Sequence, residues 1–209
     1  MKQHVALRIL GLGNIIIIAL FFTACGTSPP AKFYTLTPLP IQVQTEKVVI
    51  NEKSKFIAIG PVEIPEYLDR VEIVTRAETN QLVISEFDLW GGSIKTDISR
   101  VLIENIGAFL AGDGIAVTDW KINMAEPYRV PVIFSRFDAN AGGNMILKAQ
   151  WVVLDKEGKT FLSFKEINVT KPVKGSGYNS IVAAMSDSLG DLSKAIAESI
   201  TSIRDSIIY

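Results

Sequence analysis

The first twenty-five residues constrain this chain most. Lys2 and Arg8 make the start of the chain positive, and no acidic residue occurs before Cys25. A mostly apolar block covers residues 9–22, and the small pair Thr23-Ala24 precedes the cysteine. A basic start, a short apolar middle and a small-residue exit are typical of a secretory signal peptide. The block falls short of the ~20 apolar residues of a membrane-spanning helix. We therefore expect everything before the cysteine to be removed during export.

The cysteine changes the expectation from a secreted protein to an anchored one. Phe22-Thr23-Ala24-Cys25 resembles the lipobox of bacterial lipoproteins, in which the cysteine becomes the first mature residue and carries acyl chains such as palmitate. At ~0.8 kcal/mol per buried CH₂, several acyl chains anchor a protein stably. The alternative for a lone cysteine is a buried core thiol. We expect a signal peptide over residues 1–24 and lipidation at Cys25.

The residue after the cysteine bears on which membrane holds the protein. In lipoprotein sorting, an Asp at that position resembles a signal for retention in the inner membrane. Here the position is Gly26. The expected location is therefore the periplasmic face of the outer membrane, with the chain attached through its lipid.

Length and charge of the mature chain limit what it can be. Removal of the signal leaves 209 − 24 = 185 residues, enough for one domain with a substantial core. The signal takes two of the 21 basic residues and none of the 22 acidic ones, so the mature charge is about −3. A basic surface is what nucleic-acid binding needs, so we expect no nucleic-acid partner.

The mature chain also lacks two residue types that many enzymes need. The only histidine, His4, lies in the signal, and Cys25 is the only cysteine. Their absence excludes Ser-His-Asp and Cys-His catalysis, histidine-ligated zinc and a disulfide within the chain. The chain has no Walker motif either. We expect no catalytic residue, metal or cofactor, and only the covalent lipid on the cysteine.

The mature chain divides into a lead-in and a folded part. Residues 25–54 begin with the lipidated cysteine and contain small and proline-rich stretches typical of a tether. Within them residues 32–36 are apolar and aromatic enough for a short strand or a docked segment. Residues 55–209 form the expected domain.

Periodicity along that domain predicts alternating strands and helices. Helical spacing of apolar residues predicts helices over residues 93–111 and 179–206, and Gly190 is a candidate bend in the second. The expected strands cover residues 56–59 continued by 62–64, a hairpin of 72–76 and 81–85, then 115–120, and an antiparallel meander of 128–138, 145–154 and 160–170. The expected fold is a single α/β domain with one mixed β-sheet flanked by two main helices.

Several stretches resemble one family, the ABC-type transport auxiliary lipoproteins, whose members include the PqiC and YmbA proteins of paraquat-inducible intermembrane transport systems. The most specific piece runs over residues 59–70, with Gly-Pro-Val followed by Tyr-Leu-Asp-Arg. The other matching pieces are Phe33-Tyr34-Thr35-Leu36, Ile73-Val74-Thr75-Arg76, Glu86-Phe87 with Trp90, Arg136-Phe137-Asp138 and the closing helix.

This resemblance implies both a fold and a role. The fold is a mixed-sheet α/β domain of the anticodon-binding-domain-like kind. The role is that of an outer-membrane lipoprotein working with an inner-membrane ABC transporter and an MCE-domain protein that bridges the periplasm. The lipoprotein is then the docking piece for a bridge that carries phospholipid or other hydrophobic cargo and maintains membrane integrity. The resemblance leaves a homo-oligomer open.

Five residues are candidates for a partner-binding surface: Tyr67, Asp69, Arg70, Arg76 and Trp90. Aromatic residues are enriched at interface hot spots, and charged residues beside a turn are accessible to a partner. The alternative for the charged residues is a local ion pair or turn cap, which contributes only ~0–1 kcal/mol. The alternative for the aromatic residues is core packing.

Two other functions remain open. A carboxylate-based cell-wall hydrolase would use a pair such as Glu63 and Glu66, although Pro65 separates them and no further motif supports it. A small lipid-binding shuttle would hold one acyl chain in a pocket under the long helix. The absence of mature histidine and cysteine favours the non-enzymatic docking subunit over the hydrolase.

Overall fold

A computed structural model of the protein describes residues 28–40, 55–122, 127–140 and 143–203. Contacts divide the chain after Pro30 into two compact units, and the second, from Ala31 to Tyr209, is called the α/β unit below. The signal peptide and Cys25 lie outside the described residues, so their prediction stays a prediction.

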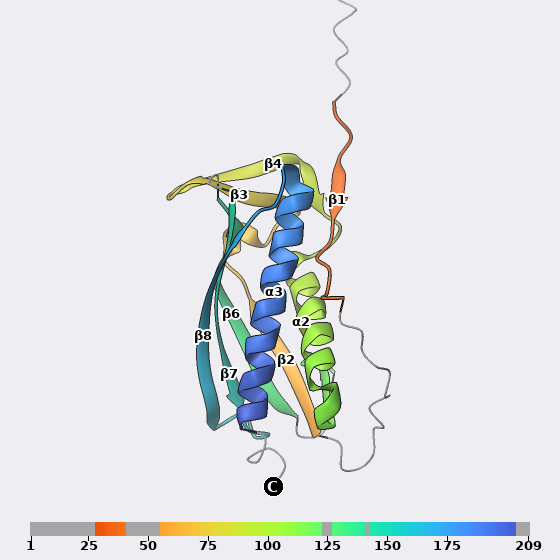
Figure 1. Ribbon diagram of the computed structural model, residues 1–209, viewed down its shortest axis with the longest axis vertical. Helices are drawn as coiled ribbons and strands as arrows, with labels where there is room; N and C mark the ends of the chain where they lie inside the picture. The colour runs from red at the N-terminus through yellow and green to blue at the C-terminus, as the bar shows by residue number, and fades with distance from the viewer. Residues whose placement is uncertain (1–27, 41–54, 123–126, 141–142, 204–209) are drawn as a thin grey trace, which may run out of the picture. The chain divides into compact units, whose positions relative to one another are not determined.

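The α/β unit contains two main helices and eight described strands, drawn in Figure 1. In chain order the elements are β1 (Lys32–Tyr34), β2 (Lys55–Glu63), the 3₁₀ turn η1 (Glu66–Leu68), β3 (Glu72–Glu78), β4 (Gln81–Trp90), α2 (Ile94–Leu110), η2 (Ala111–Asp113), β5 (Ile115–Asp119), β6 (Tyr128–Ala139), β7 (Asn144–Leu154), β8 (Phe161–Pro172) and α3 (Gly177–Ser202).

The larger sheet has five strands in the order β5-β2-β6-β7-β8. Strand β2 pairs in parallel with β5 and with β6, whereas β6, β7 and β8 form an antiparallel meander. The meander was predicted from three alternating runs separated by Gly- and Asn- or Asp-containing turns. It is confirmed, with strand ends within two residues of the predicted ones.

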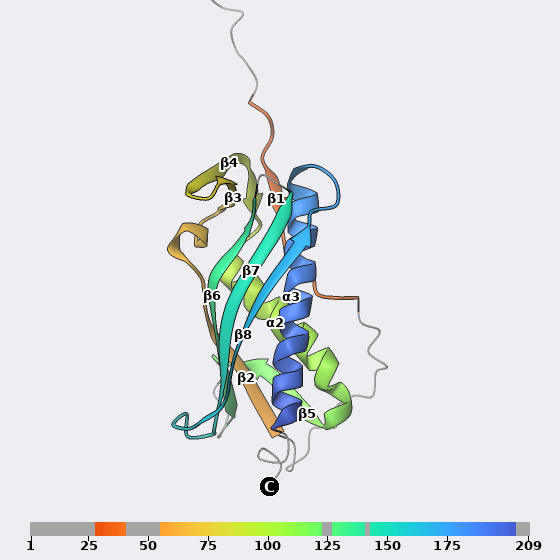
Figure 2. The ribbon, with the colours of Figure 1, turned by 60° about the vertical axis from the view of Figure 1, so that its left-hand side comes forward.

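Both helices lie side by side on one face of the larger sheet, as Figure 2 shows. In β7 every second residue from Met145 to Val153 is buried and points toward the helices. The facing stripe of α3 includes Leu189, Leu192 and Ile196, each fully buried. At the start of α2, the Ser93 side chain accepts a hydrogen bond from the Thr96 amide, which caps the helix.

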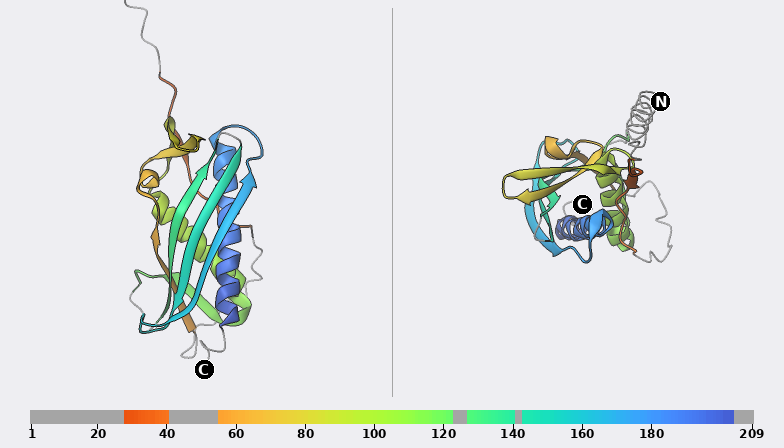
Figure 3. Two further views of the ribbon diagram at one scale, coloured as in Figure 1. Left: turned by 90° about the vertical axis from the view of Figure 1, so that its left-hand side faces the viewer. Right: turned by 90° about the horizontal axis from the view of Figure 1, so that it is seen from above.

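The predicted single mixed sheet is two sheets in the structure. Strands β1, β4 and β3 form a separate sheet, here called the small sheet. Glu72 faces Leu89 and Val74 faces Ile84, so two steps along β3 correspond to five along β4. The three extra residues of β4 bulge, and a bulge bends a strand and increases its twist. The bulge therefore accompanies a β3–β4 hairpin that lies across one end of the unit (Figure 3).

Two local predictions also differ from the structure. Gly60-Pro61 was expected to end the strand beginning at residue 56, but β2 continues through both residues. Gly60 has a φ of +118°, and a Cβ there would overlap the indole of Trp120. Only glycine therefore fits at this position. Gly190 does not interrupt α3, which is continuous from Gly177 to Ser202. Residues 204–206 of the predicted helix lie outside the described part.

Candidate functional site

A buried carboxylate joins three separate parts of the fold. Asp138, at the end of β6, is fully buried. It accepts a hydrogen bond of 2.8 Å from the Tyr67 hydroxyl of η1. It also accepts bonds of 3.2 and 3.3 Å from Arg76 of β3 and of 3.0 Å from Arg136 of β6. We call these four residues the Asp138 cluster. The cluster ties the small sheet to the larger sheet.

Electrostatics in the Asp138 cluster favour a fixed structure over proton transfer. Burial, and next the hydrogen bond to Asp138, raise the pKa of Tyr67 to about 12. The same carboxylate raises the pKa of Arg76, whose guanidinium also lies 5.6 Å from the centre of the Tyr67 ring. The guanidinium groups of Arg76 and Arg136 neutralise the Asp138 carboxylate. Burying this carboxylate therefore costs less free energy than burying an unpaired charge.

The structure brings two of the five predicted surface residues together and separates the rest. Tyr67 and Arg76 meet in the Asp138 cluster. Arg70 forms an exposed ion pair of 2.8 Å with Glu72, the local pairing that was the alternative for it. Asp69 is exposed at the end of η1. Trp90 is only 6% exposed and belongs to the core, so its ring is not a surface anchor in this structure.

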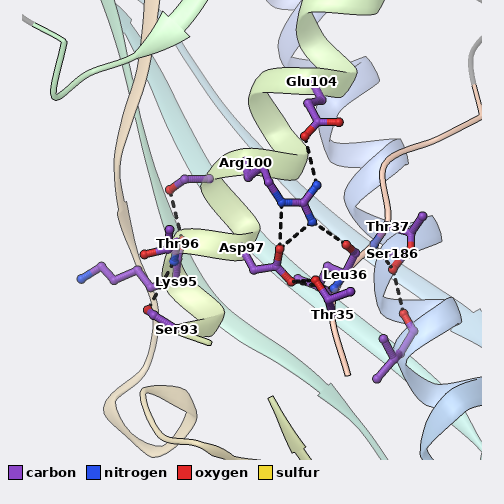
Figure 4. A network of polar contacts seen from close by, with 12 residues as sticks. Thr35, Leu36, Thr37, Ser93, Lys95, Thr96, Asp97, Arg100, Glu104 and Ser186 are labelled. Carbon is purple, nitrogen blue, oxygen red and sulfur yellow. Dashed lines mark hydrogen bonds and ion pairs between the residues drawn. The ribbon is translucent and has the colours of Figure 1, made fainter. Parts of the chain in front are cut away.

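A second network holds the chain that follows β1. Residues 35–39, here called the docked segment, lie extended against both helices (Figure 4). The Asp97 carboxylate accepts bonds from the Thr35 hydroxyl at 2.9 Å and from the Leu36 amide at 2.6 Å. Arg100 donates to the Leu36 carbonyl and to Asp97, both at 2.6 Å, and pairs with Glu104 at 3.0 Å. The docked segment thus supplies hydrogen-bond partners to the Asp97 and Arg100 side chains of α2.

The docked segment also contacts α3 and a buried residue of α2. The Thr37 amide donates to the Ser186 hydroxyl of α3 at 3.0 Å. The Leu39 amide donates to the side-chain oxygen Oδ1 of the buried Asn105 of α2 at 2.8 Å. A Cβ at Gly190 would come within 2.8–2.9 Å of the Leu39 side chain, so the missing side chain makes room for it. The docked segment therefore makes hydrogen bonds to both helices.

Partial signals for this network are present in the sequence, but none for its geometry. Helical spacing puts Asp97 and Arg100 off the apolar stripe of their helix, and there they contact the docked segment. Gly190 and the small polar residues on the buried side of α3 could have indicated a close approach. The periodicity of apolar residues does not show which segment makes this close approach to α3.

The outer face of the larger sheet, opposite the helices, exposes large apolar side chains. Ile133 of β6 is 50% exposed, and Phe161 and Phe164 of β8 are 72% and 61% exposed. Phe164 pairs with Val152, which lies on the side of β7 away from the helices. Single exposed apolar residues are normal, but a group of them on one face is typical of a binding surface. We call these three residues the apolar outer face; no sequence pattern indicated it.

Among the described residues, no group of three or more His, Cys, Asp or Glu side chains could hold a metal ion. None of the helices formed by the same residues combines the length and the apolar character required to cross a membrane.

A family model and several solved structures match this chain and agree with its fold. A model of the family described as the ABC-type transport auxiliary lipoprotein component matches residues 34–197. A crystal structure of an uncharacterized protein superposes with a TM-score of 0.69 at 17% identity, over 82% of this chain and 99% of the other. Protein XCC0632 from Xanthomonas campestris superposes with a TM-score of 0.63, also at 17% identity, over 84% and 99%.

These two structures share the fold of this chain. Their sequence identity to it is too low to indicate a shared function. No functionally curated protein matches the chain. The family match covers most of the α/β unit, from within β1 to within α3. The chain therefore belongs to the family of ABC-type transport auxiliary lipoprotein components.

Proposed function

We propose that the protein is a periplasmic lipoprotein, anchored in the outer membrane through Cys25, that serves as the docking subunit of an ABC/MCE-type intermembrane lipid transport system. The observation that carries the proposal is the family match over residues 34–197, which associates the chain with an ABC-type transport system. The proposed role involves no catalysis by this chain. Its partners are an inner-membrane ABC transporter and the MCE-domain protein that bridges the periplasm.

The docked segment supports an anchoring role. Between Cys25 and the first residue of β1, Lys32, lie only six residues. Beyond β1, Asp97 and Arg100 hold the chain on α2, and Ser186 holds it on α3. A lipid on Cys25 would therefore hold the folded unit close to the bilayer through a connection that both helices share.

The apolar outer face supports a docking role. Ile133, Phe161 and Phe164 present aliphatic and aromatic surface away from the helices, where no described part of this chain covers it. We assign this face, with the exposed Asp69 and Arg70, to contact with the MCE-domain bridge. Aromatic side chains supply the hot spots of such interfaces, and charges at the rim steer association.

Capture of the bridge protein tests the proposal. The full lipidated protein in detergent is expected to retain the MCE-domain protein of the same organism on a resin. Phe164→Asp and Arg70→Glu should each weaken capture at least tenfold, whereas Lys159→Glu, an exposed charge reversal in the turn before β8, should not. Failure of the wild-type protein to capture the bridge would refute the docking role. Unchanged capture by both surface variants would refute the surface assignment alone.

A further inference from the structure

The small sheet carries an exposed apolar group of its own. Leu82, Val83 and Ile84 are consecutive in β4 and are 36%, 40% and 48% exposed. In a strand packed on one face, alternate residues are buried, so three exposed apolar neighbours show that both faces of the hairpin reach solvent. Phe33 of β1 is 68% exposed. We call these four residues the hairpin patch.

The hairpin patch lies at the end of the α/β unit where the chain enters. Strand β1 is an edge of the small sheet and pairs in parallel with β4, with Lys32 opposite Asp88. Figures 1 and 3 show the β3–β4 hairpin across this end, and both helices run away from it. Because β1 belongs to the same sheet as the hairpin, its first residue cannot move away from the patch without breaking that sheet.

The length of chain before β1 limits how far this end can be from a bilayer. Seven residue steps separate Cys25 from Lys32. At ~3.3–3.6 Å per residue, a fully extended chain spans at most about 25 Å. A lipid on Cys25 places that residue at the membrane surface, so the first residue of β1 is always within this distance of the surface. The limit holds for any conformation of the connecting residues.

The chemistry of the hairpin patch fits an uncharged interface. All four side chains are aliphatic or aromatic. The nearby guanidinium of Arg76 is engaged with Asp138, and the other hairpin charges in β3 and β4 include the exposed Glu78 and Glu86. Attraction to anionic lipid depends on clustered Lys and Arg, which this hairpin does not present among its described residues. The hairpin patch would therefore bind a bilayer by inserting its apolar side chains, not by attraction to anionic headgroups.

We infer that the hairpin patch inserts into the interfacial region of the same bilayer that holds the lipid on Cys25, so that the small sheet is the membrane-contacting end of the unit. This inference rests on the proposed lipid anchor. The anchor keeps the patch near the surface at high effective concentration, so even weak apolar insertion is populated. The apolar outer face extends along the larger sheet, away from this constraint, and remains accessible to the bridge protein.

A spin label at the patch tests the inference. Once Cys25 is acylated, the chain has no free thiol, so an introduced cysteine is a unique labelling site. Ile84→Cys and, separately, Leu82→Cys would be nitroxide-labelled in the full acylated protein and reconstituted into phosphatidylcholine vesicles. Phe161→Cys, 72% exposed on the larger sheet, is the matched control. Accessibility of each label to oxygen and to a water-soluble nickel chelate reports whether it lies in lipid or in water.

Labels at positions 82 and 84 should be at least threefold more accessible to oxygen than to the nickel chelate, relative to the label at 161, and 0.5 M salt should not change the ratio. If all labels are equally accessible to the chelate while the protein floats with the vesicles and carries its acyl chains, the inference is wrong and the anchor stands. Protection from both reagents would mean that protein covers the patch, which also overturns it. A protein that neither carries acyl chains nor floats would refute the anchor, and the inference with it.

Discussion

Replacing the buried carboxylate by its neutral isostere, Asp138→Asn, tests the account of the Asp138 cluster. Asn keeps the shape of Asp and one acceptor oxygen but loses the charge. Its amide group turns two donor hydrogens toward partners that are themselves donors: the Tyr67 hydroxyl and the Arg76 and Arg136 guanidiniums. The variant should therefore leave these donors short of hydrogen-bond acceptors. It should also leave the two guanidinium charges without a counter-charge.

The size of the effect follows from how deeply each partner is buried. Removing one member of a fully buried ion pair costs about 3–5 kcal/mol, because the remaining charge is left in a dry site. The side chains of Arg76 and Arg136 are 16% and 24% exposed, so each recovers part of its hydration. We expect the free energy of unfolding to fall by about 2–4 kcal/mol. For a domain of this size each kcal/mol lowers the melting temperature by roughly 2–4 °C.

Urea denaturation of the chain beginning at Gly26 would measure this difference. Asp187→Asn is the matched control, since it makes the same change on an exposed residue of α3 and should cost less than about 0.5 kcal/mol. Adding Tyr67→Phe to both backgrounds gives the coupling between hydroxyl and carboxylate, expected at about 0.5–1.5 kcal/mol. If Asp138→Asn costs no more than the control, the cluster does not hold the two sheets together and the reasoning fails.

Three further predictions concern the same networks. The pKa of Tyr67 is about 12 in the folded protein against an ordinary 10.0. After solvent screening of this half-buried group, its neutral form contributes about 1–2 kcal/mol of folding free energy, fully present below pH 10 and lost as the pH rises through 12. Denaturation at pH 9 to 12 should show this loss in wild type and a smaller one in Tyr67→Phe. Asp97→Ala should speed hydrogen exchange of the Leu36 amide at least tenfold while the meander stays protected, and equal exchange would contradict the assigned bond. Gly190→Val should displace the Leu39 side chain and cost about 1–3 kcal/mol in thermal unfolding; an unchanged melting temperature would show that the contact is dispensable.

The elements with strong local periodicity could be predicted from the sequence. Both main helices and the three strands of the meander lie where the spacing of apolar residues placed them. The family resemblance, based on residues such as Gly60-Pro61 and Arg136-Phe137-Asp138, is confirmed as well. These features depend on residues that are close in the chain, and helix and strand periods are local properties.

The site needed contacts that no local pattern encodes. Tyr67 and Arg76 were selected from the sequence as surface residues, but their shared partner, Asp138, lies 71 and 62 positions away from them. Asp97 looked like an outward-facing helix residue because the segment that covers it lies 61 positions earlier. A side chain turned away from the core of its own helix can still be enclosed by a distant segment.

The sequence by itself determined which segments are helices and strands, that the chain beyond Cys25 has neither histidine nor a further cysteine, and which family the chain resembles. Only the tertiary structure decided that the strands divide into two sheets, that residues 35–39 lie on both helices, and that a buried carboxylate joins the sheets. The physical reason is that propensity and periodicity act over a few residues, whereas burial and charge neutralisation depend on which distant segments meet.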